Sequence, residues 1–350
     1  MSELEEEDAN TRQEATNTPA GPPAPITDAP ESPTIPSLLN DQAADPPAPN
    51  GHKLPVTVLN FFRSPSAVSL YGDVIQTSLI AQVMGTAVYG VTTSKEYDLA
   101  VKMRGHLHPS ERDMADFAAR STNRLLTGRM YEVHRDLRIM VGDRVAGETV
   151  AKVWQRLSGK ELRAFKKDIT PQLAAHVARM RTFRKPFIGR VGPNDEDPPQ
   201  ETRNFYDGPV GGFFGPFTGP DPEAEFDEWA LGQLSDPKQQ DKWRKRLEKD
   251  RQKRGSPRSF VLTHADLTWN NVMVAKDSTT GKYVITGIID WDRSGFLPDY
   301  VERCVLRVIS YHEKGWLEIL RAVVPKGNSR TRLQFTRVLQ SACNPMVSGW

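Results

Sequence analysis

Residues 260–290 read FVLTHADLTWNNVMVAKDSTTGKYVITGIID, and this stretch decides the fold. The apolar residues 260–262 lead into a tight loop that carries His264, Asp266 and Asn271. Residues 272–274 then resume a strand, residues 277–281 have turn composition, and residues 282–289 form an apolar partner strand that ends at Asp290. A hairpin of this kind brings Asn271 and Asp290 together at one end.

The residue types in this pattern point to phosphoryl transfer. One carboxylate must take or orient the proton of a hydroxyl, while an amide oxygen and a second carboxylate hold Mg²⁺ on nucleotide phosphates. Asp266, Asn271 and Asp290 fill these three roles, and His264 supports the loop through hydrogen bonds. The alternative is a chance His-x-Asp in a surface loop followed by a capping Asp290.

The segments HADLTWNNVMV and ITGIIDWDRSGFLPDYVE resemble the aminoglycoside phosphotransferase family, in particular its fungal branch. VAGETVAKVW and GPFTGPDPEAEFDEWAL resemble it as well, so that the resemblance covers roughly residues 97–325. It implies an α+β, two-lobed, protein-kinase-like fold with a small β-rich N-lobe and a larger, mainly helical C-lobe. It also implies ATP or another nucleoside triphosphate, Mg²⁺ and a small-molecule substrate with a hydroxyl group. Two departures are Ala265 in place of the usual Gly and Asp292 in place of the usual Glu.

Composition sets the first 50 residues apart, and the resemblance implies that the rest divides into two lobes. Residues 1–50 hold ten of the 27 prolines and ten acidic residues but one basic residue, Arg12, which leaves 45 of 46 basic and 34 of 44 acidic residues for the rest. We therefore expect a disordered, proline-rich acidic tail over residues 1–55. The N-lobe, which would bind nucleotide, is expected over 56–144. The C-lobe, with the catalytic loop, metal site and substrate site, is expected over 145–350.

The N-lobe is expected to be rich in strands, from VTVLNFF at residue 56 through IAQVMGTAVYGV to YDLAVKM. Lys102 ends the last of these runs and is the candidate phosphate contact, although a solvated lysine at a strand end is the alternative. Kinases fix this lysine with a carboxylate on the next helix. Glu111 and Asp113 both lie in that stretch. The family pattern favours Asp113, while both acids also suit a helix N-terminus.

The remaining nucleotide contacts have weaker patterns. Gly85 lies in VMGTAVYG and is a candidate for a loop over the phosphates, although the same glycines occur in ordinary hairpins. RIMVGDRVAGE resembles the linker between the lobes, where the resemblance implies that backbone groups near Val141 to Asp143 meet the adenine.

Two features of the C-lobe have alternative interpretations. Residues 158–184 have helical spacing, with a new helix expected at Pro171. The basic run 236–258 would suit RNA or an anionic surface, but its interspersed acids with Trp243 and Leu247 at helical spacing favour a solvated amphipathic helix. Acids that follow Asp290 would either line a cation-accepting pocket or cap and pair within a surface helix: Asp292, Asp299 and Glu302.

Two cysteines in 350 residues form no disulfide framework, which favours a reducing compartment. The N-terminus lacks the segments of a secretory signal, and no apolar run approaches the roughly 18 residues that span a bilayer. We expect a cytoplasmic protein without nucleic-acid or membrane partners, and the sequence leaves its oligomeric state open. The favoured function is an ATP- and Mg²⁺-dependent phosphotransferase. The alternatives are a catalytically degenerate kinase-fold module that binds nucleotide or protein, and an RNA-binding protein.

Overall fold

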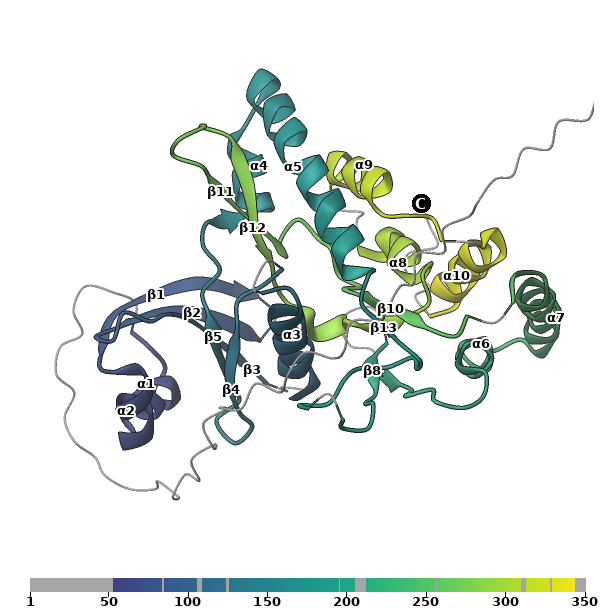
Figure 1. Cartoon of the computed structure of the whole chain (residues 1–350), viewed down its shortest axis with the longest axis horizontal. Coiled ribbons are helices and arrows are strands. Elements are labelled where there is room, and N and C mark those ends of the chain that lie inside the picture. Colours follow the sequence, from purple (N-terminus) through teal and green to yellow (C-terminus); the bar gives the residue numbers. More distant parts are fainter. Residues whose placement is uncertain are drawn as a thin grey trace, which may run out of the picture. The chain divides into compact units, whose positions relative to one another are not determined.

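The computed structural model describes residues 53–83, 85–105, 109–123, 126–194, 196–204, 212–255, 257–309, 313–327 and 329–343. The chain separates into two units, Met1–Ala44 and Asp45–Trp350, and every described residue belongs to the second (Figure 1). Residues 1–52 of the predicted disordered tail lie outside the described residues. The predicted lobe boundaries at residues 55 and 144 stay predictions.

A five-stranded antiparallel sheet dominates the first part of the described chain. Its order is β1-β2-β3-β5-β4, and the bounds are β1 Val74–Val83, β2 Thr86–Thr93, β3 Asp98–Arg104, β4 Met130–His134 and β5 Ile139–Asp143. β3 is an inner strand between β2 and β5, with Lys102 opposite Val88 and Met140. Because an inner strand is held on both sides, it can fix the position of a side chain near its end.

The stretch VTVLNFF is helical, so the expected strand at residue 56 was wrong. α1 (Val56–Arg63) buries Val58, Phe61 and Phe62, whose spacing of three and four residues defines one helix face. Together with Tyr71 of α2 (Pro65–Tyr71), that face packs on apolar residues of the sheet: Val91, Leu99, Val101, Ile139 and Val141. The aromatic and β-branched residues of this stretch favoured a strand. The stretch forms a helix instead, because the helix buries these residues on one face.

The second part of the described chain is mainly helical, with small sheets that carry the site. The helices are α4 Val150–Arg156, α5 Gly159–Met180, α6 Pro222–Gly232, α7 Pro237–Arg254, α8 Val301–Ile309, α9 Lys314–Val323 and α10 Arg330–Cys343. One sheet has the order β12-β11-β6, and another has the order β13-β10-β7. The strands are β6 Glu148–Thr149, β7 Arg184–Lys185, β8 Thr202–Arg203, β9 Phe213–Phe214, β10 Phe260–Thr263, β11 Val272–Lys276, β12 Tyr283–Ile288 and β13 Gly295–Leu297. A β-rich first part and a mainly helical second part confirm the predicted two-lobed α+β class.

Pro171 lies inside α5, so the expectation that it starts a new helix was wrong. The buried residues of this helix continue through the proline, from Ile169 to Leu173 and Val177. Pro171 itself is exposed, so the carbonyl that loses its N–H partner can bond water instead. The continuous apolar face therefore outweighs the lost hydrogen bond.

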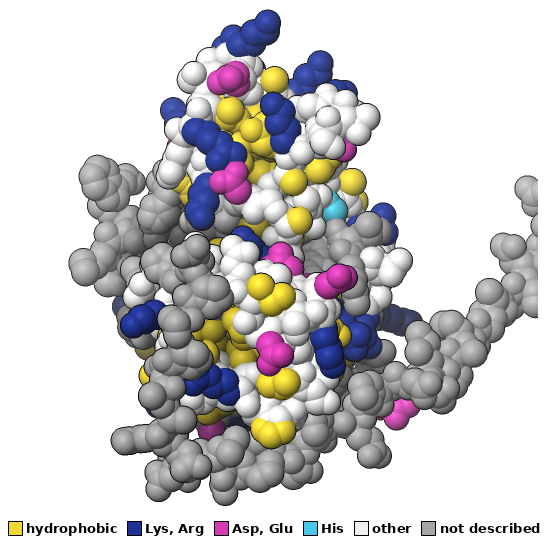
Figure 2. Space-filling model, turned by 90° about the vertical axis from the view of Figure 1, so that its left-hand side faces the viewer, with side chains coloured by type: hydrophobic (Ala, Val, Ile, Leu, Met, Phe, Trp, Pro, Cys, Tyr) yellow, Lys and Arg dark blue, Asp and Glu magenta, His cyan; other side chains and the backbone are white. Residues whose placement is uncertain are grey.

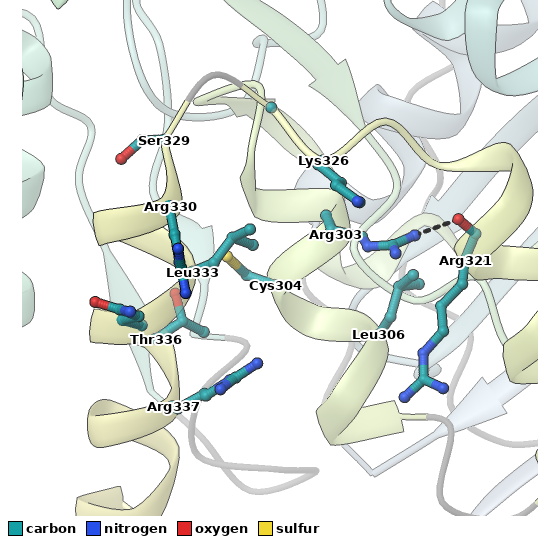
Figure 3. A pocket seen from close by; sticks show the side chains of 12 residues that line it. Arg303, Cys304, Leu306, Arg321, Lys326, Ser329, Arg330, Leu333, Thr336 and Arg337 are labelled. Atoms are coloured by element: carbon teal, nitrogen blue, oxygen red, sulfur yellow. Dashed lines mark hydrogen bonds between the residues drawn. The ribbon is translucent and has the colours of Figure 1, made fainter.

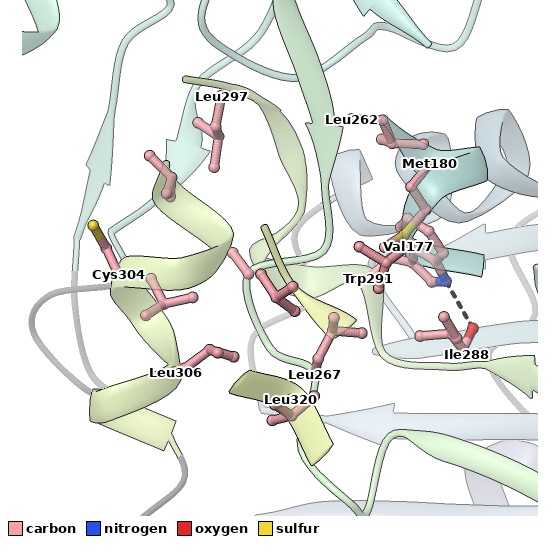
Figure 4. Close-up of a cluster of buried hydrophobic side chains, with 14 of the residues drawn as sticks. Val177, Met180, Leu262, Leu267, Ile288, Trp291, Leu297, Cys304, Leu306 and Leu320 are labelled. Carbon is pink, nitrogen blue, oxygen red and sulfur yellow. Dashed lines mark hydrogen bonds between the residues drawn. The ribbon is translucent and has the colours of Figure 1, made fainter. Parts of the chain in front are cut away.

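The core of the helical part surrounds Trp291, which is 1% exposed. Figure 4 shows its indole among side chains from distant segments, including Val177 of α5 and Leu262 of β10. Its Nε1 donates to the Ile288 carbonyl at 2.9 Å, which satisfies the buried polar group. This packing fixes the chain directly after Asp290.

The basic run forms α7, a helix that buries Trp243 and Leu247, as the amphipathic interpretation predicted. Arginines of its last turn pair with acids of α6, since Arg251 bonds Asp227 and Arg254 bonds Glu223. Figure 2 shows a different face, the left-hand side of Figure 1, on which described Lys and Arg side chains are also interspersed with apolar and acidic ones. Many charges of α7 thus serve internal pairing.

Within the described residues, no helix combines the length and apolar character needed to cross a bilayer. The cytoplasmic location stays a prediction.

Candidate active site

The loop between β10 and β11 is built around His264. This side chain is fully buried, and burial lowers the pKa of its imidazole to about 4, so the ring is neutral. Nδ1 accepts the backbone N–H of Asp266 at 3.2 Å, which leaves Nε2 to donate to the Ile289 carbonyl at 3.0 Å. The expected supporting role of His264 is confirmed, because the ring ties the loop to the chain just before Asp290.

Ala265 has a left-handed backbone, with φ of 58°. This conformation explains why the resembled family usually carries Gly here, since a Cβ costs roughly 1 kcal/mol in this region. The fully buried methyl group of Ala265 adds packing that Gly lacks. The departure from the family pattern therefore leaves the loop geometry intact.

A buried carboxylate anchors the same loop from α8. Glu302 Oε2 accepts the backbone N–H groups of His264, at 2.8 Å, and Ala265, at 3.3 Å. Burial raises the pKa of Glu302 to about 7, although the two N–H groups act in the opposite direction. The sequence suggested a cation pocket or surface pairing for this residue, and both interpretations were wrong. Glu302 lies 36 residues after Asp266 in the sequence, so no local pattern could predict its contact with this loop.

Asp266 and Asn271 are joined by their side chains. Asn271 Nδ2 donates to the carbonyl of Asp266 at 2.9 Å and to its Oδ2 at 3.1 Å. Among the described residues Asn271 Oδ1 accepts no hydrogen bond, so the amide oxygen is available to a cation. Burial and the charge of Asp290 raise the pKa of Asp266 to about 6.

Asp290 lies where the predicted hairpin closes. β11 pairs with β12 with Val272 opposite Ile288, and the Ile289 N–H donates to the Asn271 carbonyl at 2.8 Å. Asp290 itself is left-handed, with φ of 64°, which turns the chain out of the strand. A strained non-glycine residue at this point is typical of functional sites. The predicted juxtaposition of Asn271 and Asp290 is confirmed.

Lys102 links this part of the site to the sheet of the N-lobe. Its Nζ lies 2.7 Å from Asp290 Oδ1 and 2.5 Å from Glu111 Oε1. Although burial raises the pKa of Asp290, the charge of Lys102 lowers it to about 2, so this carboxylate is ionised. The Asp290 side chain remains 39% exposed and can reach a further ligand.

The carboxylate partner of Lys102 is Glu111, so the preference for Asp113 was wrong. Glu111 comes from α3 (Pro109–Ser121), and its side chain is 3% exposed. Asp113 is also buried but lies near Arg112, Asp116 and Arg190. The two acids lie two positions apart in the sequence, so their side chains point to different faces of the helix. Burial raises the pKa of Glu111 to about 7, against the attraction of Lys102.

Asp292 is neutralised by arginines and does not line a cation-accepting pocket. Its Oδ2 accepts from Arg104 of β3 at 2.8 Å and from Arg203 of β8, while its carbonyl accepts from the buried Arg190. These charges lower the pKa of Asp292 although burial acts to raise it. Asp299 is likewise near a cation, with its Oδ2 3.9 Å from Arg181. Sequence reasoning missed the three arginines around Asp292, which carry no motif of their own.

The other predicted nucleotide contacts lie around the N-lobe sheet. Gly85 has φ of 75° in the β1–β2 turn, and a Cβ there would meet nothing within 4 Å. Val141 is fully buried in β5, between β3 and β4, and Asp143 ends that strand. The Asp143 carboxylate accepts from Arg129 N–H at 2.9 Å and from the Tyr131 hydroxyl at 2.5 Å. Their contact with adenine stays a prediction.

Comparison with known proteins gives the family. Residues 86–298 match the phosphotransferase enzyme family, so the chain belongs to that family, which confirms the resemblance. Its fungal branch stays a prediction. Among curated proteins no sequence matches the chain.

Solved structures with similar coordinates include an aminoglycoside phosphotransferase in complex with ADP and hygromycin B, at 14% identity over 80% of this chain and 89% of that one, with a TM-score of 0.47. A macrolide 2'-phosphotransferase from Brachybacterium faecium is 14% identical over 80% of this chain and 97% of that one, with a TM-score of 0.43. An ethanolamine kinase from Plasmodium vivax is 10% identical over 75% and 70%, with a TM-score of 0.38.

Proposed function

We propose that this protein is an ATP- and Mg²⁺-dependent phosphotransferase that acts on a hydroxyl group of a small molecule. The observation that carries the proposal is that Lys102 of the N-lobe sheet pairs with Asp290, while Asn271 bonds Asp266 through their side chains. A backbone hydrogen bond from Ile289 to Asn271 brings the two pairs together. Family membership supports phosphoryl transfer.

The side chains suit a magnesium ion. Mg²⁺ in nucleotide sites takes one or two protein oxygens and completes its shell with phosphates and water. Asp290 supplies an ionised, partly exposed carboxylate, and Asn271 supplies an amide oxygen. The described residues contain no group of three or more His, Cys, Asp or Glu that would hold a metal by themselves. A bound Mg²⁺ would neutralise phosphate charge during transfer.

Lys102 would contact the nucleotide phosphates while Glu111 holds it in place. The charges of Asp290 and Glu111 raise the pKa of Lys102, although burial lowers it, so the amine is positive. When phosphates arrive, Lys102 can exchange its Asp290 contact for them and keep Glu111. In the same proposal, Gly85 lets the β1–β2 turn approach the phosphates. The adenine contacts backbone groups from Val141 to Asp143 and in the connection that follows them.

Asp266 would act on the acceptor. The hydroxyl oxygen forms a bond to the γ-phosphorus as the bond to the leaving β–γ oxygen breaks, and the hydroxyl proton passes to Asp266. A pKa of about 6 leaves most of this carboxylate ionised at pH 7 and makes it a stronger base than an ordinary aspartate. Asn271 and His264 orient the loop without taking the proton.

The test combines nucleotide binding with turnover. We expect ATP to raise the melting temperature more with Mg²⁺ than without it, and Asp290→Ala to remove that metal-dependent part. Asp266→Asn should keep the nucleotide shift and lower turnover by roughly 10²-fold or more, measured across a library of hydroxyl metabolites.

Each outcome separates the candidate functions. Full binding without turnover of any acceptor in wild-type protein would favour the degenerate module. Stabilisation by RNA without any effect of Mg²⁺ and nucleotide would overturn the phosphotransferase proposal. Leu247→Ala, a core change remote from these side chains, is the control for a merely destabilised protein.

A further inference from the structure

A cavity of about 540 Å³ lies among α8, α9 and α10, and none of its lining residues belongs to the site around Asp266 (Figure 3). Five of its twelve lining residues are basic, and none of the described residues that line it is acidic: Arg303, Arg321, Lys326, Arg330 and Arg337. They come from three helices and the connection between α9 and α10. The volume is in the range that suits a small ligand.

Three of the five cations of this cavity have no ion-pair partner among the described residues. Arg321, Lys326 and Arg330 form no ion pair with any described residue. Arg332, on another face of α10, is in contrast 1% exposed and bonds Asp227 and Glu223. These two acids of α6 therefore pair with a cation that does not line the cavity.

One cation of the cavity is held rigidly. Arg303 Nη1 donates to the Arg321 carbonyl at 2.6 Å and to the Val324 carbonyl at 3.2 Å (Figure 3). Burial and the charge of Arg321 both lower the pKa of Arg303, which reflects mutual repulsion within the cluster. A bound anion would relieve that repulsion.

The remaining lining is polar enough for an anionic ligand and not suited to covalent chemistry. The hydroxyls of Ser329 and Thr336 donate within the protein, to Asp250 Oδ1 and to the Arg332 carbonyl. Gln334 Oε1 accepts from Arg246, which leaves the Gln334 amide N–H groups for a ligand. Cys304 also lines the cavity, but its side chain is buried and burial raises the pKa of its thiol to about 12. A thiol of this kind is unreactive at neutral pH.

We propose that this cavity is a second binding site, for a small ligand that carries a phosphate group. Guanidinium groups match phosphate oxygens in charge and in hydrogen-bond geometry. The limited volume of about 540 Å³ favours a small molecule over an extended acidic chain. The site would allow a phosphorylated metabolite to bind without entering the phosphotransfer site.

The test is calorimetric titration of the full chain with inorganic pyrophosphate, in EDTA and at constant ionic strength. We expect measurable binding that persists in Lys102→Ala, which disables the phosphate contact of the other site. Arg330→Gln/Arg337→Gln should weaken the affinity by roughly tenfold or more, because hydrogen bonds between charged groups are lost. Lys326→Gln provides a milder second variant.

Lys245→Gln/Lys249→Gln removes the same net charge from the exposed side of α7 and should leave the affinity unchanged. Equal weakening in this control, loss of binding in Lys102→Ala, or no binding in wild-type protein would overturn the proposal. Citrate, titrated in parallel, tests the chemistry of the ligand. Tighter binding of citrate than of pyrophosphate would overturn the assignment to phosphate.

Discussion

The ion pair between Lys102 and Glu111 gives a prediction that depends on pH. Glu111 is buried, and with Lys102 beside it burial still raises the pKa of its carboxyl to about 7. Replacement of Lys102 by Met removes the attraction and moves this pKa further upward. When the pKa of a carboxyl is higher in the folded state than in the unfolded state, the folded state binds more protons between these two pKa values. The stability of the protein therefore falls as the pH rises, until the pH exceeds the pKa of the folded state.

Above pH 7 the pH exceeds the Glu111 pKa of the wild-type protein, so this carboxyl causes no further loss of stability. In Lys102→Met the Glu111 pKa is higher, so the stability continues to fall above pH 7. With roughly 1.4 kcal/mol per pH unit, the variant should lose about 1 to 2 kcal/mol more than wild type between pH 7.5 and 9.0. In a protein of this size the added loss corresponds to roughly 2 to 3 °C in melting temperature. Loss of the Asp290 contact contributes equally at both pH values, because that carboxylate is ionised throughout.

The assay is thermal unfolding at pH 7.5 and 9.0 of wild type, Lys102→Met and Lys102→Met/Glu111→Leu. The double variant lacks the Glu111 carboxyl, so its loss of stability between pH 7.5 and 9.0 should not exceed that of wild type. Lys276→Met, an exposed lysine on β11, is the matched control. An equal effect of Lys102→Met at both pH values would refute the reasoning, as would a double variant that keeps the pH dependence.

Three further predictions concern the base, the helical core and the tail. Because the pKa of Asp266 is raised to about 6, kcat/KM should fall roughly tenfold between pH 7 and 5, and a flat pH–rate profile would exclude this residue as the base. Arg332→Leu removes one of the two arginines that pair with each of the buried acids Asp227 and Glu223, and it should cost about 2 kcal/mol in urea unfolding, against about 0.5 kcal/mol or less for the exposed Arg330→Leu on the same helix. Equal losses in the two variants would show that these buried ion pairs do not stabilise the fold. A chain that starts at Gly51 should melt within about 2 °C of the full chain in calorimetry and bind nucleotide equally well, since the proline-rich acidic segment has little apolar surface to bury, and a larger drop would mean that the segment docks.

The site shows which contacts local sequence encodes. The β11–β12 hairpin follows from a short apolar run at residues 272–274, a turn at residues 277–281 and a second apolar run. Its closure brings Asn271 and Asp290 together by strand pairing alone. His264, Asp266 and Asn271 share one short loop, so their proximity was also determined by spacing.

Tertiary structure decided the contacts between segments far apart in the chain. Glu111 rather than Asp113 meets Lys102 because α3 presents one face to β3, and Glu302 reaches the loop from α8. VTVLNFF forms a helix because a sheet covers its apolar face. Sequence patterns encode the hydrogen bonds of neighbouring residues, whereas burial, charge pairing and pKa depend on what other segments pack against them.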